Sequence, residues 1–472
     1  MTRQAGRRLI LVALAQILAL GALAVWAGRW DGIAAPALAA APAHATTAPR
    51  QTAPCTDTSL SYKQPFDVPV HASKRQTDFD CLSWRSLVAL NWPASSKDAG
   101  QPDTTKKFGQ PGDLNLVVWQ TFKQPELVFL PTGGNPCPEC PDPPTPECLK
   151  RCWNQKPSLH ALAATSQVLS LRSKVAMSAT RQAVPNAWLT DFEKNLARYE
   201  IRINEPSFNY IVANKLYNGR HQKVSKIQAD FPTGKSQDEV GGISIKAAWK
   251  ILVRPADRSH YLSMEATIHD SKVNPRTGYD DPNGVYVTCG DEGPYCKRTV
   301  GLVGFHIAHK AKDNQKWVWS TFEHEDNAPL DGTRPARGYS FYDPRCAEKY
   351  GPVLCQPNKN PQRVDPKDVD MRRPVQVTRI KTADILPDDV NAQWRQLVKG
   401  TPWEHYVLVS TQWVNQEGKF VPEVLSNTTM ETYIQDRGPK TASCLQCHSF
   451  ASTLAGKTGD FVYLLSNAQP RK

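Results

Sequence analysis

The segment Cys444-Leu445-Gln446-Cys447-His448 constrains this chain more than any other feature. Two thiols separated by two residues, with a histidine directly after the second, form the attachment signature of a c-type haem. The thiols add to the porphyrin vinyl groups, and the histidine supplies one axial nitrogen to the iron. We therefore predict one covalent haem c, held by Cys444 and Cys447, with His448 as the proximal ligand. The alternative is a dithiol redox motif that happens to precede a histidine.

The position of this motif near the C-terminus predicts a dependence on the rest of the chain. Residues 449–472 contain neither methionine nor histidine. The sixth iron ligand then comes from upstream, is Lys457 or Tyr463, or is absent. We therefore expect residues 401–472 to be a haem attachment segment that is not independent of a body formed by residues 61–400.

A predicted β-hairpin provides the first candidate for the distal side of the haem. Two apolar runs, VGLVGFHIAHK and WVWSTFEH, flank a polar turn. Because side chains alternate across a strand, His306 shares a face with Gly304 and Ala308, whose small side chains leave room for a flat macrocycle. We predict His306 as the distal ligand or pocket residue, with Thr321 or Glu323 holding its second nitrogen. An ordinary buried histidine is the alternative.

Met430 is the alternative candidate for the distal ligand. A thioether suits haem c and raises its reduction potential. Residues 426–431 predict the start of a helix that leads to the haem motif, with Thr428 and Glu431 as a capping box. On such a helix Met430 serves equally well as a core residue.

The N-terminal sequence predicts export. Basic residues precede an apolar run over residues 9–27, and small-residue cleavage sites follow at 37–39 and 43–45. We predict residues 1–45 to be a signal peptide, or an uncleaved membrane anchor because the run approaches the length that spans a bilayer. Residues 46–60, rich in Ala, Pro and Thr, read as a linker. The expected location of the body is the periplasm.

Cysteine usage agrees with an oxidising compartment. Twelve cysteines less the haem pair leave an even number for disulfides. Sequence proximity suggests three short staples: Cys289 with Cys296, Cys346 with Cys355, and Cys55 with Cys81. A Cys/Pro-rich excursion at residues 135–155 holds four further cysteines, for which two disulfides are favoured over a zinc site.

The charge of the chain bears on its partners. The formal net charge is +12, but the basic residues are scattered and no nucleic-acid module appears. A basic cytochrome surface fits an acidic redox partner protein or anionic lipid, and a solvated surface without a specific partner is the alternative. We expect a redox partner protein, no nucleic acid, and a possible membrane tether through the N-terminus.

The pattern of apolar runs predicts an α+β fold. Segments with strand character alternate with short helical segments from about residue 201 onward. We expect a body rich in antiparallel strands, with a helical haem-bearing C-terminal segment packed on it so that both share one core.

Several segments together resemble a known group of proteins. They are NYIVANKLYN (209–218), IKAAWKIL (245–252), VGLVGFHIAHK (300–310), WVWSTFEHEDNAP (317–329), LVSTQWV (408–414) and LSNTTMETYIQ…SCLQCHSFA (425–451). The chain is similar to large bacterial cytochrome c family proteins of the proteobacterial type, with a single C-terminal CxxCH motif and mostly no assigned substrate. The resemblance implies haem binding and electron transfer. Cys444, Cys447 and His448 carry over as haem residues, whereas no distal ligand does, and the excursion around residues 137–152 looks like a local elaboration.

Two functions are compatible with these observations. The first is a periplasmic monohaem c-type cytochrome that acts in electron transfer, which the lone haem favours. The second is a haem c oxidoreductase, whose open distal site takes peroxide, oxygen or a small substrate, with His306 and Glu323 as an acid–base pair. The large body favours this second reading, because a simple carrier needs only about 100 residues.

Overall fold

The computed structural model describes residues 54–68, 75–155, 167–170, 188–270, 272–276, 281–312, 314, 316–360, 370–381 and 386–469. The chain divides into two compact units, Met1–Thr52 and Ala53–Lys472, and all described residues belong to the second. The predicted leader at residues 1–45 and the start of the predicted linker at 46–60 therefore lie outside the described residues.

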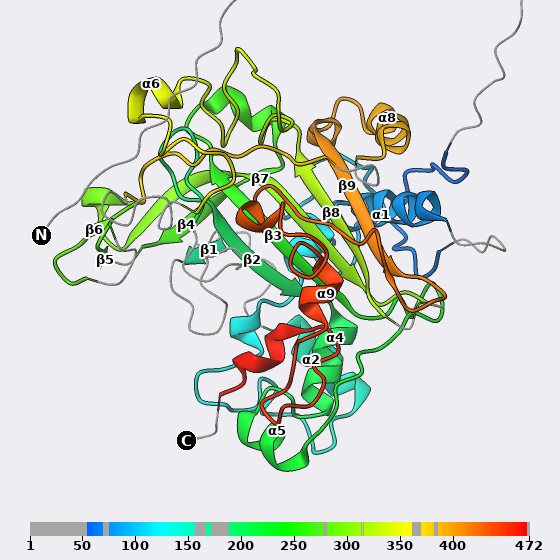
Figure 1. The fold of residues 1–472 in the computed structure, drawn as a ribbon. Helices are drawn as coiled ribbons and strands as arrows, with labels where there is room; N and C mark the ends of the chain where they lie inside the picture. The colour runs from blue at the N-terminus through cyan, green and yellow to red at the C-terminus, as the bar shows by residue number, and fades with distance from the viewer. Residues whose placement is uncertain are drawn as a thin grey trace, which may run out of the picture. The chain divides into compact units, whose positions relative to one another are not determined.

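One large sheet organises the second unit (Figure 1). Its strands are β1 (Gln167–Ser170), β2 (Arg198–Ile203), β3 (Ile243–Ile251), β4 (Ser263–His269), β7 (Tyr295–His309), β8 (Val318–His324), β9 (Tyr406–Val414) and β10 (Phe420–Val421). The short strands β5 (Lys272–Val273) and β6 (Val285–Tyr286) form a separate pair. Every described pair is antiparallel except β1 with β4.

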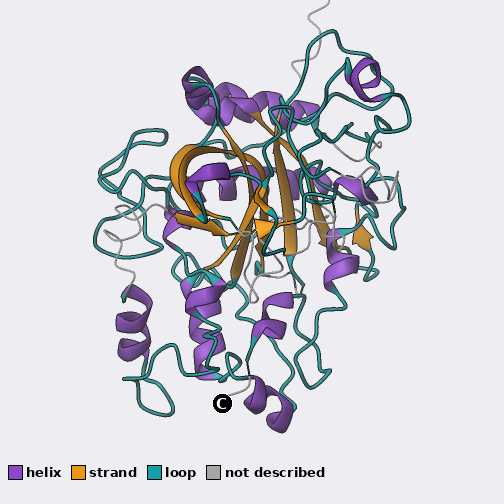
Figure 2. Cartoon of the chain, turned by 90° about the vertical axis from the view of Figure 1, so that its left-hand side faces the viewer, coloured by secondary structure: helices purple, strands orange, loops and turns teal. Residues whose placement is uncertain are grey.

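The helices are short apart from the first. They are α1 (Gln76–Leu90), α2 (Pro146–Asn154), α4 (Glu205–Ala213), α5 (Gly219–Ser225), α6 (Cys346–Tyr350), α8 (Asp388–Leu397) and α9 (Cys444–His448). Figure 2 shows the strands in the middle of this unit, with helices and long loops around them. The α+β class with an antiparallel body is thus confirmed.

The predicted hairpin is present as β7 and β8. Phe305 pairs with Phe322 and His306 with Thr321, as the alternation of apolar residues requires. The same alternation predicts that Val303 shares the face of Phe305, and this prediction was wrong. The register between β3 and β7 shifts at this point, so Val303 has no cross-strand partner on β3 and packs in a separate buried cluster.

Helix α1 covers one face of the sheet. Its Ser83 hydroxyl lies 2.7 Å from that of Ser320 on β8 and 2.6 Å from that of Thr411 on β9. Trp84 packs edge-on against Phe322 with ring centroids 5.2 Å apart. These contacts make that face part of the main hydrophobic core and leave the opposite face for the C-terminal segment.

The disulfide predictions are confirmed. The structure joins Cys55 to Cys81, Cys137 to Cys152, Cys140 to Cys148, Cys289 to Cys296 and Cys346 to Cys355. Because all four cysteines of the 135–155 excursion are paired, they are not available as thiolate ligands of zinc.

Candidate functional site

Helix α9 is a single helical turn that is anchored to strand β9. The Ser443 hydroxyl accepts a hydrogen bond from the Gln446 amide at 3.3 Å and so caps the turn. The buried Gln412 of β9 accepts from the Leu445 amide at 2.8 Å and donates to the Ser443 hydroxyl at 3.0 Å. Because both the oxygen and the nitrogen of the Gln412 side chain are hydrogen-bonded to the motif, they fix its position on the sheet.

Cys444 and Cys447 are the free cysteines of the chain, because the other ten are paired. Sγ of Cys444 lies 3.7 Å from the Leu425 carbonyl oxygen, and Sγ of Cys447 lies 3.2 Å from that of Thr441. Burial, together with the nearby Glu431 carboxyl, raises the pKa of both thiols. A dithiol redox motif works through a lowered thiol pKa, so this environment disfavours that alternative.

The imidazole of His448 is oriented by the tail that follows it. Its Nδ1 lies 2.8 Å from the carbonyl oxygen of Phe461, which can only accept, so Nδ1 carries the proton and Nε2 keeps its lone pair. The Trp319 ring lies against this imidazole with centroids 4.1 Å apart, and the Tyr463 ring lies at 5.2 Å. Burial lowers the pKa of His448 to about 4, so the ring is neutral at pH 7.

The structure brings His306 close to this group. It lies on β7 between its cross-strand neighbours Lys246 on β3 and Thr321 on β8. Its Nδ1 accepts a hydrogen bond from the Trp319 indole at 3.4 Å. Nε2 is buried, makes no hydrogen bond with any described residue, and lies 3.5 Å from Oε2 of Glu431. Burial, then the positive charge of Lys246, lowers the pKa of His306 well below its usual value.

The predicted partners of His306 do not hold it. Glu323 instead accepts two hydrogen bonds from the Arg379 guanidinium, at 2.9 and 2.7 Å, and one from the Thr428 amide. Thr321 is the direct neighbour across the strands but donates no hydrogen bond to either imidazole nitrogen. Glu431 is the carboxyl that faces His306, and it comes from a loop rather than from the hairpin.

The predicted helix at residues 426–431 is not formed. The chain makes turns there and then a short 3-10 helix, Thr432–Ile434. Glu431 accepts a hydrogen bond from the Asn427 amide at 2.9 Å, which closes this loop without a regular helix. The capping box of Thr428 with Glu431 was therefore wrong, because Asn427 takes the place expected for Thr428.

Met430 is fully buried in the same separate cluster as Val303 and Tyr433, whereas Cys444 belongs to the main core. The 427–430 loop also fills the space beside Gly304: a Cβ added there would meet the Thr429 hydroxyl and lie 3.3 Å from Met430 Cε. We expected a macrocycle to occupy the space beside Gly304, but the 427–430 loop fills it. The packing favours a core role for Met430.

Two residues of this group, Lys246 and Glu431, were not predicted as site residues from the sequence. Lys246 is half-buried and its Nζ lies 5.5 Å from the centroid of the Tyr199 ring. Burial raises the pKa of Glu431 to about 7, and the charge of Lys246 opposes this shift. A lysine inside the apolar strand GGISIKAAWKILV was a signal that could have been used.

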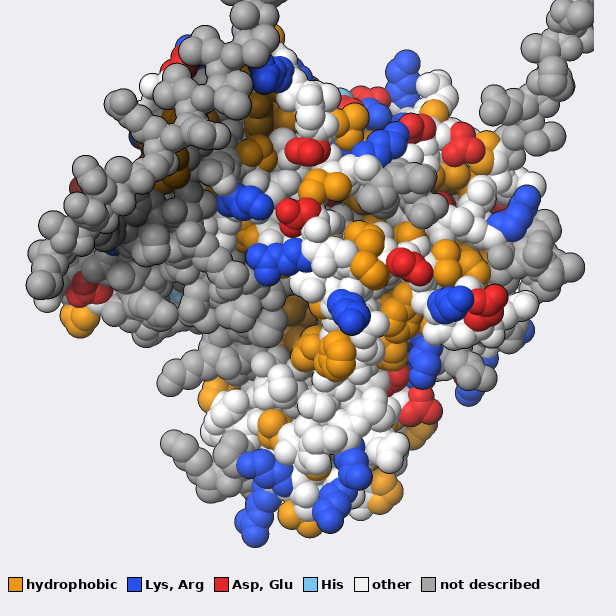
Figure 3. All heavy atoms as spheres, in the orientation of Figure 1, with side chains coloured by type: hydrophobic (Ala, Val, Ile, Leu, Met, Phe, Trp, Pro, Cys, Tyr) orange, Lys and Arg blue, Asp and Glu red, His pale blue; other side chains and the backbone are white. Residues whose placement is uncertain are grey.

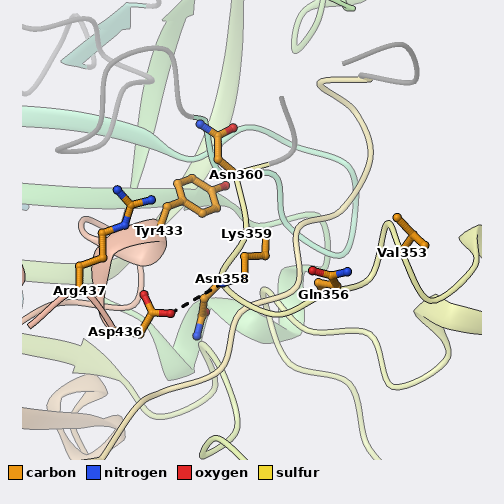
Figure 4. A pocket seen from close by; sticks show the side chains of 8 residues that line it. All are labelled: Val353, Gln356, Asn358, Lys359, Asn360, Tyr433, Asp436 and Arg437. Atoms are coloured by element: carbon orange, nitrogen blue, oxygen red, sulfur yellow. Dashed lines mark ion pairs between the residues drawn. The ribbon is translucent and has the colours of Figure 1, made fainter. Parts of the chain in front are cut away.

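A cavity of about 420 Å³ is lined in part by residues that follow Glu431 in the chain (Figure 4). It is lined by Val353, Gln356, Asn358, Lys359, Asn360, Tyr433, Asp436 and Arg437. Lys359 Nζ lies 3.7 Å from a carboxylate oxygen of Asp436 across it. None of these lining residues is a predicted site residue.

Comparison of the chain with protein-family models, with curated proteins and with solved structures finds no match. The described residues contain no cluster of three or more His, Cys, Asp or Glu side chains that is suited to hold a metal ion. Among the same residues, no helix is both long enough and apolar enough to cross a membrane.

Proposed function

We propose that this protein is a periplasmic c-type cytochrome with one covalent haem, and that it acts in electron transfer. The observation that carries the proposal is the combination at α9. Two free thiols flank a turn anchored by Gln412, and a carbonyl bond at Nδ1 leaves Nε2 of His448 available. A metal-bound histidine requires its other nitrogen to be held in this manner.

The residues around α9 fit a haem by their chemistry. Cys444 and Cys447 would form the thioether bonds, and His448 would hold the iron, which supplies one-electron redox chemistry when the group is bound. Trp319 and Tyr463 would exclude water from the imidazole of His448. Phe461 keeps the proton on Nδ1 of that imidazole, so the coordinating nitrogen stays neutral.

For the distal side we propose His306 ahead of Met430. Nε2 of His306 is a buried nitrogen without a hydrogen bond among the described residues, which is costly unless another group engages it. To bind iron through Nε2, the imidazole would have to carry its proton on Nδ1 and give up the 3.4 Å bond from the Trp319 indole. The thioether of Met430 needs no further bonding partner, since it is stable in the apolar cluster where it packs.

Export to the periplasm is proposed from two features. The five disulfides are typical of an oxidising compartment, and the sequence of residues 1–45 has the pattern of a secretory signal or anchor. We also propose membership of the large bacterial cytochrome c proteins described above. That proposal rests on the resemblance alone.

The decisive experiment is to produce the protein in a host with a cytochrome c maturation system and test for covalent haem. We expect peroxidase staining on a denaturing gel and a haem c pyridine haemochrome spectrum. Cys444→Ser with Cys447→Ser should abolish the stain. The matched control, Cys346→Ser with Cys355→Ser, removes one disulfide and should keep it. A wild-type protein whose colour is fully extracted by acid acetone would refute the proposal.

A second function, a haem oxidoreductase with an open distal site, is favoured by one specific observation. The Trp319 indole donates to Nδ1 of His306, which places the imidazole proton on Nε2, opposite the Glu431 carboxyl. An imidazole N–H beside a carboxyl is an acid–base pair that could serve peroxide or a small substrate. Glu431 thereby replaces Glu323 in the role expected from the sequence. A ferric EPR spectrum that is high-spin and changes on addition of cyanide would favour this function over electron transfer.

A further inference from the structure

Two segments of the chain that carry only positive charge lie next to each other. Residues 213–229, which include α5, and residues 437–459, which include α9, contain Lys and Arg but no Asp or Glu. Their exposed cations include Arg220, Lys223 and Lys226 in the first segment and Lys457 in the second. Within the described ranges none of these four side chains forms an ion pair.

Hydrogen bonds join the two segments into one surface. The side chain of Gln222 on α5 donates to the Leu465 carbonyl at 2.9 Å and accepts from the Leu454 amide at 2.8 Å. The Ala229 amide donates to the Thr458 carbonyl at 3.0 Å, next to Lys457. Figure 3 shows Lys and Arg side chains gathered at the end of the second unit where α5 lies, with no acidic side chain beside them on the face in view.

Exposed apolar side chains lie on the same two segments and on the tail. Val224 of α5 is 75% exposed, and Phe450, two residues after His448, is 69% exposed. Tyr463 is 37% exposed, and its hydroxyl donates to the Cys447 carbonyl at 2.8 Å. We call the four cations and these three apolar residues the basic face. Exposed apolar side chains combined with charged ones are a common composition of a docking surface.

We propose that the basic face is the docking surface for an acidic electron-transfer protein. The inference rests on the proposed function, and it names where the partner binds. The occupant is argued from charge, because four exposed cations without an ion pair among the described residues attract an acidic partner and speed its association. The exposed Asp230, which directly follows the first segment, is paired with Lys310. Phe450 and Tyr463 place the partner beside the turn that holds Cys447.

The test uses the holoprotein and two charge-reversed variants of equal net charge. The first, Arg220→Glu with Lys223→Glu and Lys457→Glu, changes the basic face. The matched control, Lys297→Glu with Arg334→Glu and Lys399→Glu, changes exposed cations on β7, after β8 and after α8. The probe is an acidic blue-copper protein. Electron transfer from the reduced haem is followed by stopped flow at low and at high ionic strength.

We expect the wild-type rate to fall as salt is added, because the attraction is electrostatic. At low salt the basic-face variant should react about tenfold more slowly, and the control variant should stay within about twofold of the wild type. Equal losses in both variants would overturn the proposal, since net charge alone would then explain them. So would an unchanged rate in the basic-face variant combined with lost binding to phosphatidylglycerol vesicles, which would assign the face to a membrane.

A failure of the haem proposal remains distinguishable from a failure of this one. Without covalent haem there is no stain on a denaturing gel and no electron transfer in any variant. Binding of the acidic probe, measured by calorimetry, does not require haem. Binding that is lost in the basic-face variant and kept in the control supports the docking surface, and binding that is equal in both refutes it.

Discussion

Nε2 of His306 lies 3.5 Å from Oε2 of Glu431, and neither the carboxyl nor any other described group gives this nitrogen a hydrogen bond. The two residues come from β7 and from the loop that precedes α9, so their proximity depends on the C-terminal segment folding over the sheet. A buried imidazole nitrogen without a hydrogen bond fits two kinds of site: one that binds a ligand and one that exchanges a proton.

The first prediction concerns this imidazole. If His306 is the distal ligand, His306→Ala should convert a low-spin ferric spectrum to a high-spin one while the haem stays covalently bound. Met430→Leu, which conserves volume in its apolar cluster, should leave the spectrum unchanged. Optical and EPR spectra of the two variants test whether His306 is the distal ligand. A low-spin spectrum that survives His306→Ala would remove His306 as the ligand.

The second prediction concerns the anchoring of α9. Gln412→Ala removes the acceptor of the Leu445 amide and the donor to Ser443. Leaving these buried groups unpaired should cost about 1–3 kcal/mol of unfolding free energy and lower the fraction of protein that carries haem. Urea denaturation and haem-to-protein absorbance ratios measure both effects. As a control, Gln237→Ala removes an exposed glutamine that bonds the Gln64 carbonyl, and it should change neither.

Strand β7 shows what the sequence can predict and what it cannot. The period of two in VGLVGFHIAHK was enough to place Gly304, His306 and Ala308 on one face, because a strand repeats its geometry at every second residue. The same rule misplaced Val303, since a register shift against β3 breaks the period there and leaves no local signature.

The neighbours of His306 were harder to predict from the sequence than its position on the strand. Glu431 reaches it through a loop more than a hundred residues away along the chain, and Lys246 reaches it from a third strand. Neither contact follows from spacing, because tertiary packing decides which loop covers a sheet face. Cysteine pairs were easier, since the disulfides join cysteines close together in sequence, by 26 residues at most.

The third prediction tests the packing of the loop that carries Glu431. In Gly304→Ala the new methyl group meets the Thr429 hydroxyl and approaches the Asn427 side-chain oxygen to 3.0 Å. The loop must move, and overpacking of this kind costs about 1–3 kcal/mol. Gly338→Ala is the matched control, because its nearest neighbour is the Tyr342 carbonyl at an ordinary 3.6 Å. Equal unfolding free energies for both variants would contradict the described position of the loop.

The last prediction is a pH dependence that is independent of haem. Asp80 on α1 is buried against β9, and burial raises its pKa to about 7 from 3.8. Between these two pH values the folded state keeps a proton that the unfolded state has lost, so this group lowers stability as pH rises from 4 to 7. Asp80→Asn removes the titration and should gain up to about 4 kcal/mol relative to the wild type over this range.

The comparison must be made as a difference between variant and wild type, because buried neutral histidines act in the opposite direction. The pKa of His309 is lowered to about 4, so that group stabilises the fold as pH rises. Both proteins contain it, and its contribution cancels in the difference. Asp388→Asn, at a carboxylate that is 79% exposed, is the control and should show no trend. A difference for Asp80→Asn that is flat from pH 4 to 7 would mean that the Asp80 carboxyl is charged in the folded protein.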